Sequence, residues 1–453
     1  MRKTAGARIG TSSMGRRDFL RKVGVTLGAA GLTGITGPFD FVKAAIGQGE
    51  RGIYITDIYR TKISGLGGVI VRLETNKGIV GYGECRDLDD QSVVWLNTFA
   101  PYIIGMNPTQ VEKVYNMMLQ IWSIPANMLY NQERMGTGAI SGIEMACWDI
   151  IGKVYNVPIF KLLGPRLYDK VTMYADTDSN RVQDVVSRVE KGFKHYKCDM
   201  YLSGIARGNY TTSMTQNNYG YREITINQAG LDQMHAYMEQ YRETLQSFGE
   251  PYASAPIGSD HYQGYNATNQ LSVESAIALA DTLKDHNPDG YVEDIIDWWI
   301  DGGSGLPSKE VADATDMRVQ TGEDMFGFDQ FKPWADIGAL DNFHPEPNTF
   351  GGINETLLAA IYADMNGIKT YYHNSSGPIA MTAYAHLAAA TPGFVALEFH
   401  QMDRPWHDDL VDGIEKPMIQ DGMMSVPEGP GLGIILNEDN MRMHGHRDWT
   451  PVP

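Results

Sequence analysis

The 453-residue sequence predicts an α/β protein in which a (β/α)8 barrel of the TIM type follows a smaller N-terminal α+β domain. Eight short apolar runs alternate with helix-like segments over roughly 230 residues, and nearly every run ends in a polar residue. Three of these polar residues are acidic, Asp260, Glu293 and Glu323, at intervals of 33 and 30 residues. Each interval fits one strand plus one helix. The three carboxylates should therefore meet at the carboxyl end of a barrel, where active sites of this fold lie.

The first 45 residues differ from the rest of the chain. Arg16 and Arg17 precede the apolar, Gly/Ala-rich stretch 23–36, and small residues follow at 42–44. This order predicts a twin-arginine export signal in residues 1–45 and a periplasmic location for the remaining protein. The alternative is a cytoplasmic protein with a disordered basic tail.

Composition limits the classes of partner. With 43% hydrophobic and 20% charged residues the chain has ordinary globular composition. Residues 1–45 hold eight Lys/Arg and two Asp, so the chain without them has 29 basic and 53 acidic residues and a net charge of −24. Such a surface repels nucleic acid and anionic lipid, and we expect neither as a partner. No later segment has the 18 or so apolar residues in a row that a membrane span needs.

Residues 46–165 are predicted to form the α+β domain. Apolar runs at 53–55, 68–75 and 79–84 have strand character, and Asn76-Lys77-Gly78 between the last two predicts a hairpin turn. From about residue 107 to 154 apolar residues recur at helical spacing. A small antiparallel sheet followed by helices makes a separate domain, which should end near Gly164-Pro165.

The barrel is predicted to occupy residues 166–400. Its strands are expected at 171–175, 196–199, 256–260, 291–293, 318–323, 342–346, 370–373 and 394–398. A doubly wound open sheet is the structural alternative, but it does not explain the polar residue that ends nearly every run.

Two segments interrupt or follow this pattern. Residues 201–226, rich in Gly, Asn, Thr and Tyr, make the interval between the second and third predicted strands about twice as long as the other intervals. A long loop at this place is typical of a lid, a substrate-contacting arm or a contact with a second subunit. Residues 401–453, rich in Pro and Gly, are expected to pack back on the N-terminal domain. The three cysteines are isolated, without CxxC spacing, and we expect buried thiols: Cys85, Cys147 and Cys198.

The three strand-end acids predict a metal site. Converging carboxylates repel one another unless a cation lies between them, and an all-oxygen ligand set suits Mg²⁺. The alternative for each residue singly is a helix N-cap or a surface position.

Three motifs resemble the enolase superfamily, in particular its mandelate racemase / muconate lactonizing enzyme branch. They are Gly81-Tyr82-Gly83-Glu84, the helical run 142–149 and Gly351-Gly352-Ile353. The resemblance covers essentially the whole chain after residue 45. It implies a modified, enolase-like barrel under an N-terminal capping domain, and it places Asp260, Glu293 and Glu323 on the metal-ligand positions. It also implies a homo-oligomer.

His373 ends the seventh predicted strand and Glu346 the sixth, so their side chains should be neighbours. A carboxylate bonded to one imidazole nitrogen fixes the tautomer and makes the other nitrogen an effective acid or base. The family that the chain resembles commonly has Asp at the position of Glu346, so the extra methylene can shift the histidine. The alternative for His373 is a structural histidine.

Lys197 and Asp199 end the second predicted strand, where the same family often has a Lys-x-Lys pair. A lysine beside a cation in a cleft can act as a base. Because Asp199 replaces the second lysine, Lys197 is instead expected to act as an electrostatic partner of the substrate or of Asp199. This departure argues against a two-base racemase.

Two further positions are candidates for substrate contact. Tyr262 lies two residues beyond Asp260 and should point into the same mouth, where a phenol can donate a proton or bind a hydroxyl; His261 is a second candidate, and a core or rim role is the alternative for both. The resemblance places Glu398, which ends the eighth strand, near the substrate carboxylate.

The resemblance implies an enzyme that removes the proton next to a carboxylate, with Mg²⁺ stabilising the enediolate. We expect a lyase that dehydrates an aldonic or aldaric sugar acid to a 2-keto-3-deoxy acid. A racemase, epimerase or cycloisomerase of a carboxylated sugar is the alternative in the same class. A non-catalytic periplasmic protein that binds a carboxylate is the alternative in another class.

Overall fold

The computed structural model describes residues 52–453 except 64, 67, 87–90, 127–132, 178–180, 218–220, 263–268, 288, 401–403 and 446–447. The predicted export signal lies outside the described residues. Among the described residues, no helix combines the length and the apolar character needed to cross a bilayer.

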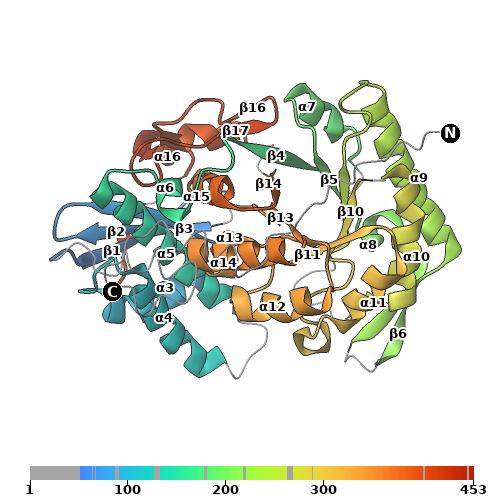
Figure 1. Cartoon of the computed structure of the whole chain (residues 1–453), viewed down its shortest axis with the longest axis horizontal. Coiled ribbons are helices and arrows are strands. Elements are labelled where there is room, and N and C mark those ends of the chain that lie inside the picture. Colours follow the sequence, from blue (N-terminus) through green and yellow to red (C-terminus); the bar gives the residue numbers. More distant parts are fainter. Residues whose placement is uncertain are drawn as a thin grey trace, which may run out of the picture. The chain divides into compact units, whose positions relative to one another are not determined.

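The N-terminal domain is built on a four-stranded antiparallel sheet in the order β19-β1-β2-β3 (Figure 1). Its strands are β1 (Ile55–Lys62), β2 (Gly68–Thr75), β3 (Val80–Arg86) and β19 (Thr450–Pro451). The predicted hairpin between β2 and β3 is present, and Gly78 takes the positive φ of 71° that its turn requires. The first strand begins at Ile55, where the prediction had it end, because polar residues on the open face of the sheet conceal the strand pattern of Thr56–Lys62.

Helix α5 (Glu133–Tyr155) packs on this sheet, and α3 (Gln91–Ile103) and α4 (Val111–Ala126) pack on α5 (Figure 1). The short α6 (Phe160–Leu163) contacts α15 (Pro378–Ala390) of the barrel. Strand β3 lies so close to α5 that a Cβ on Gly83 would come within 1.9 Å of the carbonyl oxygen of Gly142. The glycines of the Gly81–Glu84 motif are therefore required by close packing of strand on helix.

Eight parallel strands form the closed barrel, which confirms the predicted fold class. They are β4 (Lys170–Thr177), β5 (Tyr196–Asp199), β8 (Ile257–Asp260), β10 (Tyr291–Glu293), β11 (Arg318–Thr321), β12 (Asn342–Phe343), β13 (Lys369–Tyr372) and β14 (Phe394–Phe399). Pairing of β14 with β4 closes the ring. Strand β12 is shorter than predicted because Pro345 has no N–H to donate to the ladder.

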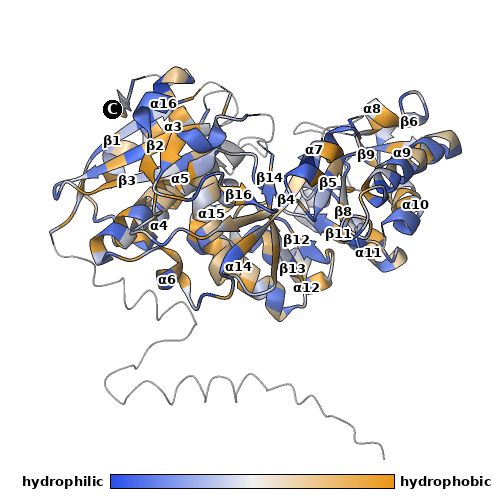
Figure 2. Ribbon diagram, turned by 90° about the horizontal axis from the view of Figure 1, so that it is seen from above, coloured by the Kyte–Doolittle hydropathy of each residue, from blue (hydrophilic) through white to orange (hydrophobic). Residues whose placement is uncertain are grey.

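Helices connect the strands on the outside of the barrel. They are α7 (Asp184–Glu190), α9 (Gln228–Gln246), α10 (Val273–Leu283), α11 (Leu306–Ala314), α12 (Gly327–Ile337), α14 (Gly352–Met365) and α15 (Pro378–Ala390), with the short α8 (Leu202–Ile205) and α13 (Pro347–Phe350) and the 3₁₀ turns η1 (Lys284–His286) and η2 (Ile300–Gly303). Helix α9 mixes hydrophilic and hydrophobic residues in Figure 2 because one face is buried, through Met234, Met238, Tyr241 and Leu245, and the other is polar.

The long segment 201–226 has a structure of its own. It forms the hairpin of β6 (Tyr210–Gln216) and β7 (Arg222–Ile226), and β7 also pairs in parallel with β9 (Asn269–Leu271). The strands of the hairpin are rich in threonine, a β-branched residue that favours extended backbone without an aliphatic pattern.

The C-terminal segment contacts both domains. It contains η3 (His407–Leu410), β15 (Val411–Asp412), β16 (Ile419–Gln420), β17 (Met423–Ser425), β18 (Ile435–Leu436) and α16 (Glu438–Met443). Strand β17 pairs antiparallel with the first half of β4, and β19 extends the N-terminal sheet beside β1.

All three cysteines are buried thiols, as predicted.

Buried acids of the N-terminal domain bind the amino ends of two barrel helices. Glu84, at the end of β3, accepts from the amides of Gly377 and Ala380 at the start of α15, at 2.5 and 3.1 Å. Glu144, on α5, accepts from the amides of Ile353 and Asn354 at the start of α14, at 2.8 and 3.1 Å. The first amides of a helix have no partner within the helix, so these glutamates satisfy them and complement the helix dipole. The two domains are thus joined by hydrogen bonds from helix amides to buried acidic side chains.

Glu144→Gln is expected to flatten the dependence of stability on pH. Burial raises the pKa of Glu144 from 4.5 to about 8 although three N–H donors lower it. A carboxyl group whose pKa is raised on folding stabilises the fold fully below pH 4.5, and this contribution is lost as the pH rises to about 8. The contribution is on the order of a few kcal/mol, at about 1.4 kcal/mol for each unit. Melting temperatures at intervals over this range measure it. An equal slope in wild type and variant would contradict the assignment.

Gly352→Ala is expected to destabilise the protein by about 3 kcal/mol. Gly352 has φ of +89°, and a Cβ there would lie 2.2 Å from Oε2 of Glu144, a carboxylate fixed by its hydrogen bonds. Gly367→Ala is the matched control, because Gly367 has φ of +80° with no atom within 4 Å of the added Cβ. It should cost only the backbone strain, about 1 kcal/mol. Chemical unfolding of both variants measures the difference, and equal losses would contradict the clash.

Candidate active site at the carboxyl ends of the barrel strands

The parallel register brings the predicted acidic residues to one level of the barrel. Asp199 on β5 is paired with Asp260 on β8, and Asp260 is paired with Glu293 on β10. Glu323 follows β11 after Gly322, whose φ of 137° suits glycine. All four side chains are buried. Four acidic side chains buried this close together need partners that compensate their charge.

Glu293, Asp294 and Glu323 offer carboxylate oxygens that lie within 4.8 Å of one another. Asp294 directly follows Glu293 but was not among the predicted ligands. Its φ is +45°, and its Oδ1 accepts from Thr321 Oγ1 at 2.6 Å. Burial, then the charges of Glu323 and Glu293, raise the pKa of Asp294 well above its ordinary value. Acidic side chains are therefore crowded together at the ends of β10 and β11.

Lys197 lies between the predicted acids. Its Nζ is 3.4 Å from Asp260, 3.1 Å from Glu293 and 2.7 Å from Glu398. Burial lowers the pKa of the lysine, but the three carboxylates raise it well above its ordinary value. Lys197 is therefore a fixed positive charge in this arrangement, which favours the role of electrostatic partner over that of base.

Opposing effects act on the acids around Lys197. Burial and the charges of Glu293 and Glu323 raise the pKa of Asp260 well above its usual range, although Lys197 lowers it. Burial also raises the pKa of Glu293, but His344 and Lys197 together bring it below its ordinary value. Asp199 has a strongly raised pKa because of burial and of the neighbouring Asp176 and Asp260.

His373 and Glu346 are brought together as predicted from their strand positions. Nδ1 of His373 lies 2.5 Å from Oε2 of Glu346, so the longer acidic side chain reaches the imidazole. Arg86 donates to the same oxygen at 3.0 Å, and Tyr384 donates to the other one. Glu346 thus has a partner on each oxygen. The hydrogen bond at Nδ1 leaves Nε2 as the nitrogen that can exchange a proton.

Nε2 of His373 faces the acidic cluster. It lies 3.0 Å from Glu323 and 3.5 Å from Glu398. Burial lowers the pKa of His373, but the charges of Glu323, Glu398 and Glu346 raise it well above its ordinary value.

Three further residues at the site, besides Asp294, were not predicted from the sequence. Arg86 comes from the N-terminal domain, at the end of β3. His344 follows β12; its Nδ1 lies 3.2 Å from Glu293 and its Nε2 lies 2.6 Å from the hydroxyl of Tyr174. His400 follows β14, two residues beyond Glu398. Side chains two residues apart on a strand point to the same face, so the argument that assigned Tyr262 to the mouth of the barrel also applies to His400.

Tyr262 and His261 lie on different sides of the chain after β8. Tyr262 donates its amide to Oδ1 of Asp260 at 2.9 Å and is half-buried. His261 is fully buried with Nε2 3.1 Å from Ser259 Oγ, and burial lowers its pKa to about 4. Because Ser259 and His261 alternate with Asp260, the histidine points away from the mouth. Of the two candidates, Tyr262 has the better position for contact with a substrate.

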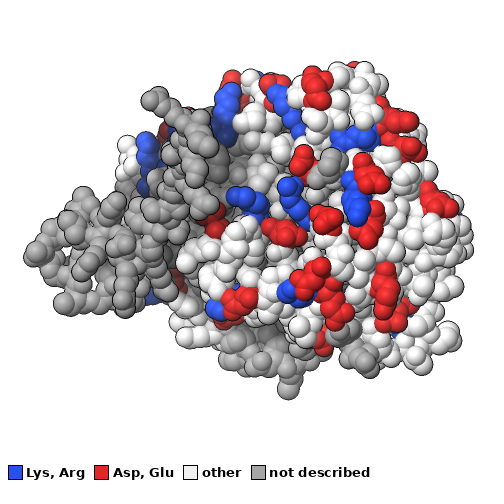
Figure 3. All heavy atoms as spheres, turned by 45° about the vertical axis from the view of Figure 1, so that its right-hand side comes forward, with Lys and Arg blue, Asp and Glu red and all other residues white. Residues whose placement is uncertain are grey.

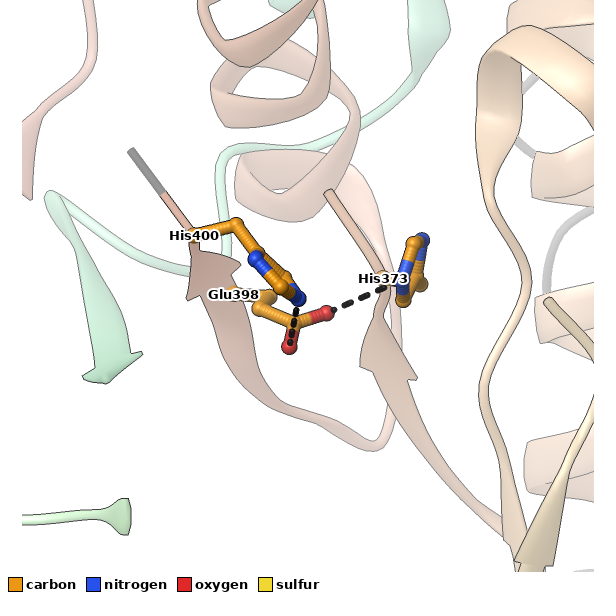
Figure 4. A group of neighbouring side chains, drawn as sticks. All are labelled: His373, Glu398 and His400. Carbon is orange, nitrogen blue, oxygen red and sulfur yellow. Dashed lines mark ion pairs between the residues drawn. The ribbon is translucent and has the colours of Figure 1, made fainter. Parts of the chain in front are cut away.

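Glu398, His373 and His400 form a second cluster, from the ends of the neighbouring strands β13 and β14 (Figure 4). One carboxylate oxygen and one nitrogen of each histidine lie within 4.8 Å of one another. Lys197 and His373 hold Glu398 ionised, since they lower its pKa against the effect of burial.

Comparison with known proteins agrees with this geometry. The family model described as Enolase C-terminal domain-like matches residues 182–440, and the model of the mandelate racemase / muconate lactonizing enzyme N-terminal domain matches residues 58–164. A D-xylonate dehydratase of Haloferax volcanii is 27% identical over 403 residues, 87% of this chain and 90% of that relative. A D-galactonate dehydratase family member of Musicola paradisiaca is 25% identical over 415 residues, 85% and 92% of the two chains.

Solved structures share the fold. The crystal structure of a mandelate racemase/muconate lactonizing enzyme-like protein from Rubrobacter xylanophilus superposes with a TM-score of 0.72 at 24% identity, and the match covers 86% of this chain and 97% of that one. The whole architecture of the described residues, cap and barrel together, is therefore one that other proteins adopt.

Proposed function

The chain belongs to the mandelate racemase / muconate lactonizing enzyme family of the enolase superfamily, and from that premise we propose that it dehydrates a sugar acid. In the proposed reaction the proton next to the carboxylate is removed, the hydroxyl of the following carbon leaves as water, and the enol becomes a 2-keto-3-deoxy acid. The names of the two relatives, D-xylonate and D-galactonate dehydratase, support an aldonic acid as substrate.

One observation carries the proposal. Nε2 of His373, the nitrogen left open by the bond to Glu346, lies 3.0 Å from Glu323 within the acidic cluster. His373 can accept a proton only as a neutral ring, and a cation that compensates the charge of Glu323 would favour that form.

The donor set fits a hard divalent cation. It consists of buried carboxylate oxygens, and burial together with mutual repulsion raises the pKa of Asp260 and of Asp294. We propose that Asp260, Glu293 and Glu323 hold Mg²⁺, with Asp294 behind them. When bound, the cation would supply positive charge that stabilises the negative charge developing on the substrate carboxylate.

The chain's own residues have separate tasks in this proposal. His373 takes the proton at Nε2, while Glu346 and Arg86 fix its ring. Lys197 orients the substrate as a permanent cation, and Tyr262 contacts a substrate hydroxyl. Glu398 keeps Lys197 in place by its charge. We also propose export through the twin-arginine segment, which rests on the order of Arg16 and Arg17, the apolar stretch 23–36 and the small residues 42–44.

Proton NMR of the purified protein with Mg²⁺ in D₂O tests the reaction against D-xylonate, D-galactonate, D-gluconate and a wider set of aldonic and aldaric acids. Signals of a 2-keto-3-deoxy acid are the expected result. Deuterium entering next to the carboxylate without loss of water would instead indicate a racemase or epimerase. No change with any acid would favour a protein that only binds carboxylates.

A further inference from the structure

A second imidazole–carboxylate pair lies at the barrel mouth, separate from the pair of His373 and Glu346. Nε2 of His400 is 3.1 Å from Oδ2 of Asp176. The register of β14 and β4 pairs Phe399 with Ala175, so His400 and Asp176 occupy the next position of the same pair of strands. The pair is therefore fixed by the barrel itself.

His400 and His373 flank one carboxylate. Glu398 lies between them, with Oε1 3.8 Å from His400 and Oε2 3.5 Å from His373, and the ring centroids are 6.2 Å apart (Figure 4). A nitrogen of each ring lies within 4.8 Å of one of the other. This separation lets one ring reach the hydrogen on one carbon of a substrate while the other reaches the hydroxyl on the next carbon.

Exposure distinguishes the two histidines. The side chain of His373 is 4% exposed and that of His400 is 32% exposed. His400 can therefore exchange protons with water while His373 stays enclosed. Asp176 and Glu398 place two carboxyl groups next to His400, at 3.1 and 3.8 Å from its Nε2.

Loss of a hydroxyl group needs a proton, because hydroxide is a poor leaving group. Lys197 is committed to three carboxylates, and His373 is assigned to the proton next to the substrate carboxylate. We propose that His400, positioned by Asp176, is the general acid that protonates the departing hydroxyl, an inference that rests on the proposed dehydration.

His373 takes the proton from the carbon next to the carboxylate, the C–H electron pair becomes the carbon–carbon double bond, and the C–O bond of the neighbouring carbon breaks. The oxygen leaves with its electron pair and the proton of His400, as water. The enol then gains a proton on carbon and loses one from oxygen. His400 regains its proton from solvent, and His373 releases its own.

His400→Gln with a fluorinated substrate tests the assignment. Fluoride leaves with less need of a proton than hydroxide does. For the aldonic acid that the wild type dehydrates fastest, we expect kcat for loss of water to fall about 10²-fold or more. With the corresponding 3-deoxy-3-fluoro acid, loss of fluoride should fall by less than about tenfold. Asp176→Asn should show the same pattern to a smaller extent. His444→Gln, which changes a partly exposed histidine stacked on Trp406, is the control and should leave both reactions unchanged.

Equal losses with both leaving groups would overturn the assignment, because a residue that only supports the structure affects both reactions alike. Unchanged loss of water in His400→Gln would overturn it as well. In either case a wild type that dehydrates the parent acid leaves the proposed function standing. A wild type that dehydrates no acid of the set removes the proposed function and this assignment together.

Discussion

His373→Asn is expected to lower kcat for loss of water by about 10³-fold, the largest effect of any single change to the acid–base groups. Asparagine keeps a polar group near Glu346 but has no nitrogen that can take up a proton at this position. Nε2 of His373 is the open nitrogen of a ring whose Nδ1 is fixed 2.5 Å from Glu346. The variant should therefore also lose exchange of the proton next to the carboxylate with D₂O.

Kinetics by NMR in D₂O measure both quantities in one experiment. Glu346→Gln is the companion variant, because it keeps the size of the side chain while removing the charge; it should retain part of the exchange that His373→Asn loses. Melting temperatures show whether each variant is folded. A folded His373→Asn protein that still exchanges the proton would assign the base to another residue.

Glu293→Gln is expected to weaken Mg²⁺ binding by at least about 100-fold and to abolish turnover at moderate Mg²⁺ concentrations. Glu293 is fully buried, and its two oxygens contact Lys197, His344 and Gln320. A neutral amide removes a charged ligand and also leaves Lys197 with one carboxylate fewer. Titration calorimetry with Mg²⁺ measures the affinity without depending on activity.

Two neighbouring variants decide which carboxylates belong to the metal site. Asp260→Asn should weaken Mg²⁺ binding to an extent similar to Glu293→Gln. Asp294→Asn should retain most of the affinity, because Asp294 is bonded to Thr321 and is proposed to lie behind the ligands. The reverse result would make Asp294 the third ligand, in line with its place within 4.8 Å of Glu293 and Glu323.

The eight barrel strands could be predicted because each is a short buried run, and nearly all of these runs end in a polar residue. The same logic placed Asp260 and Glu293 in adjacent positions, where the register has them. It failed where a side chain reaches across the fold. Arg86 contacts a residue 260 positions away along the chain, and no local pattern reports such a contact.

Short-range signals were also missed. Asp294 stands directly after a predicted ligand, and its positive φ makes it share the site instead of alternating away from it. The segment 201–226 nearly lacks aliphatic periodicity, so no strands were predicted in it, but two strands pair there through their backbones. The charges of Figure 3 agree with the composition: acidic side chains spread over the face shown, interspersed with basic ones.

The glutamates that bind the amino ends of α14 and α15 have a consequence for recombination between relatives. Glu84 and Glu144 belong to one domain and the amides that they satisfy belong to the other. Arg86 adds a third bond of this kind, directly to the carboxylate behind His373. A cap taken from another family member would have to bring two acids and one arginine to the same three places. The two domains therefore constrain each other's sequences, and the cap is a fixed component of the catalytic apparatus, not an exchangeable module.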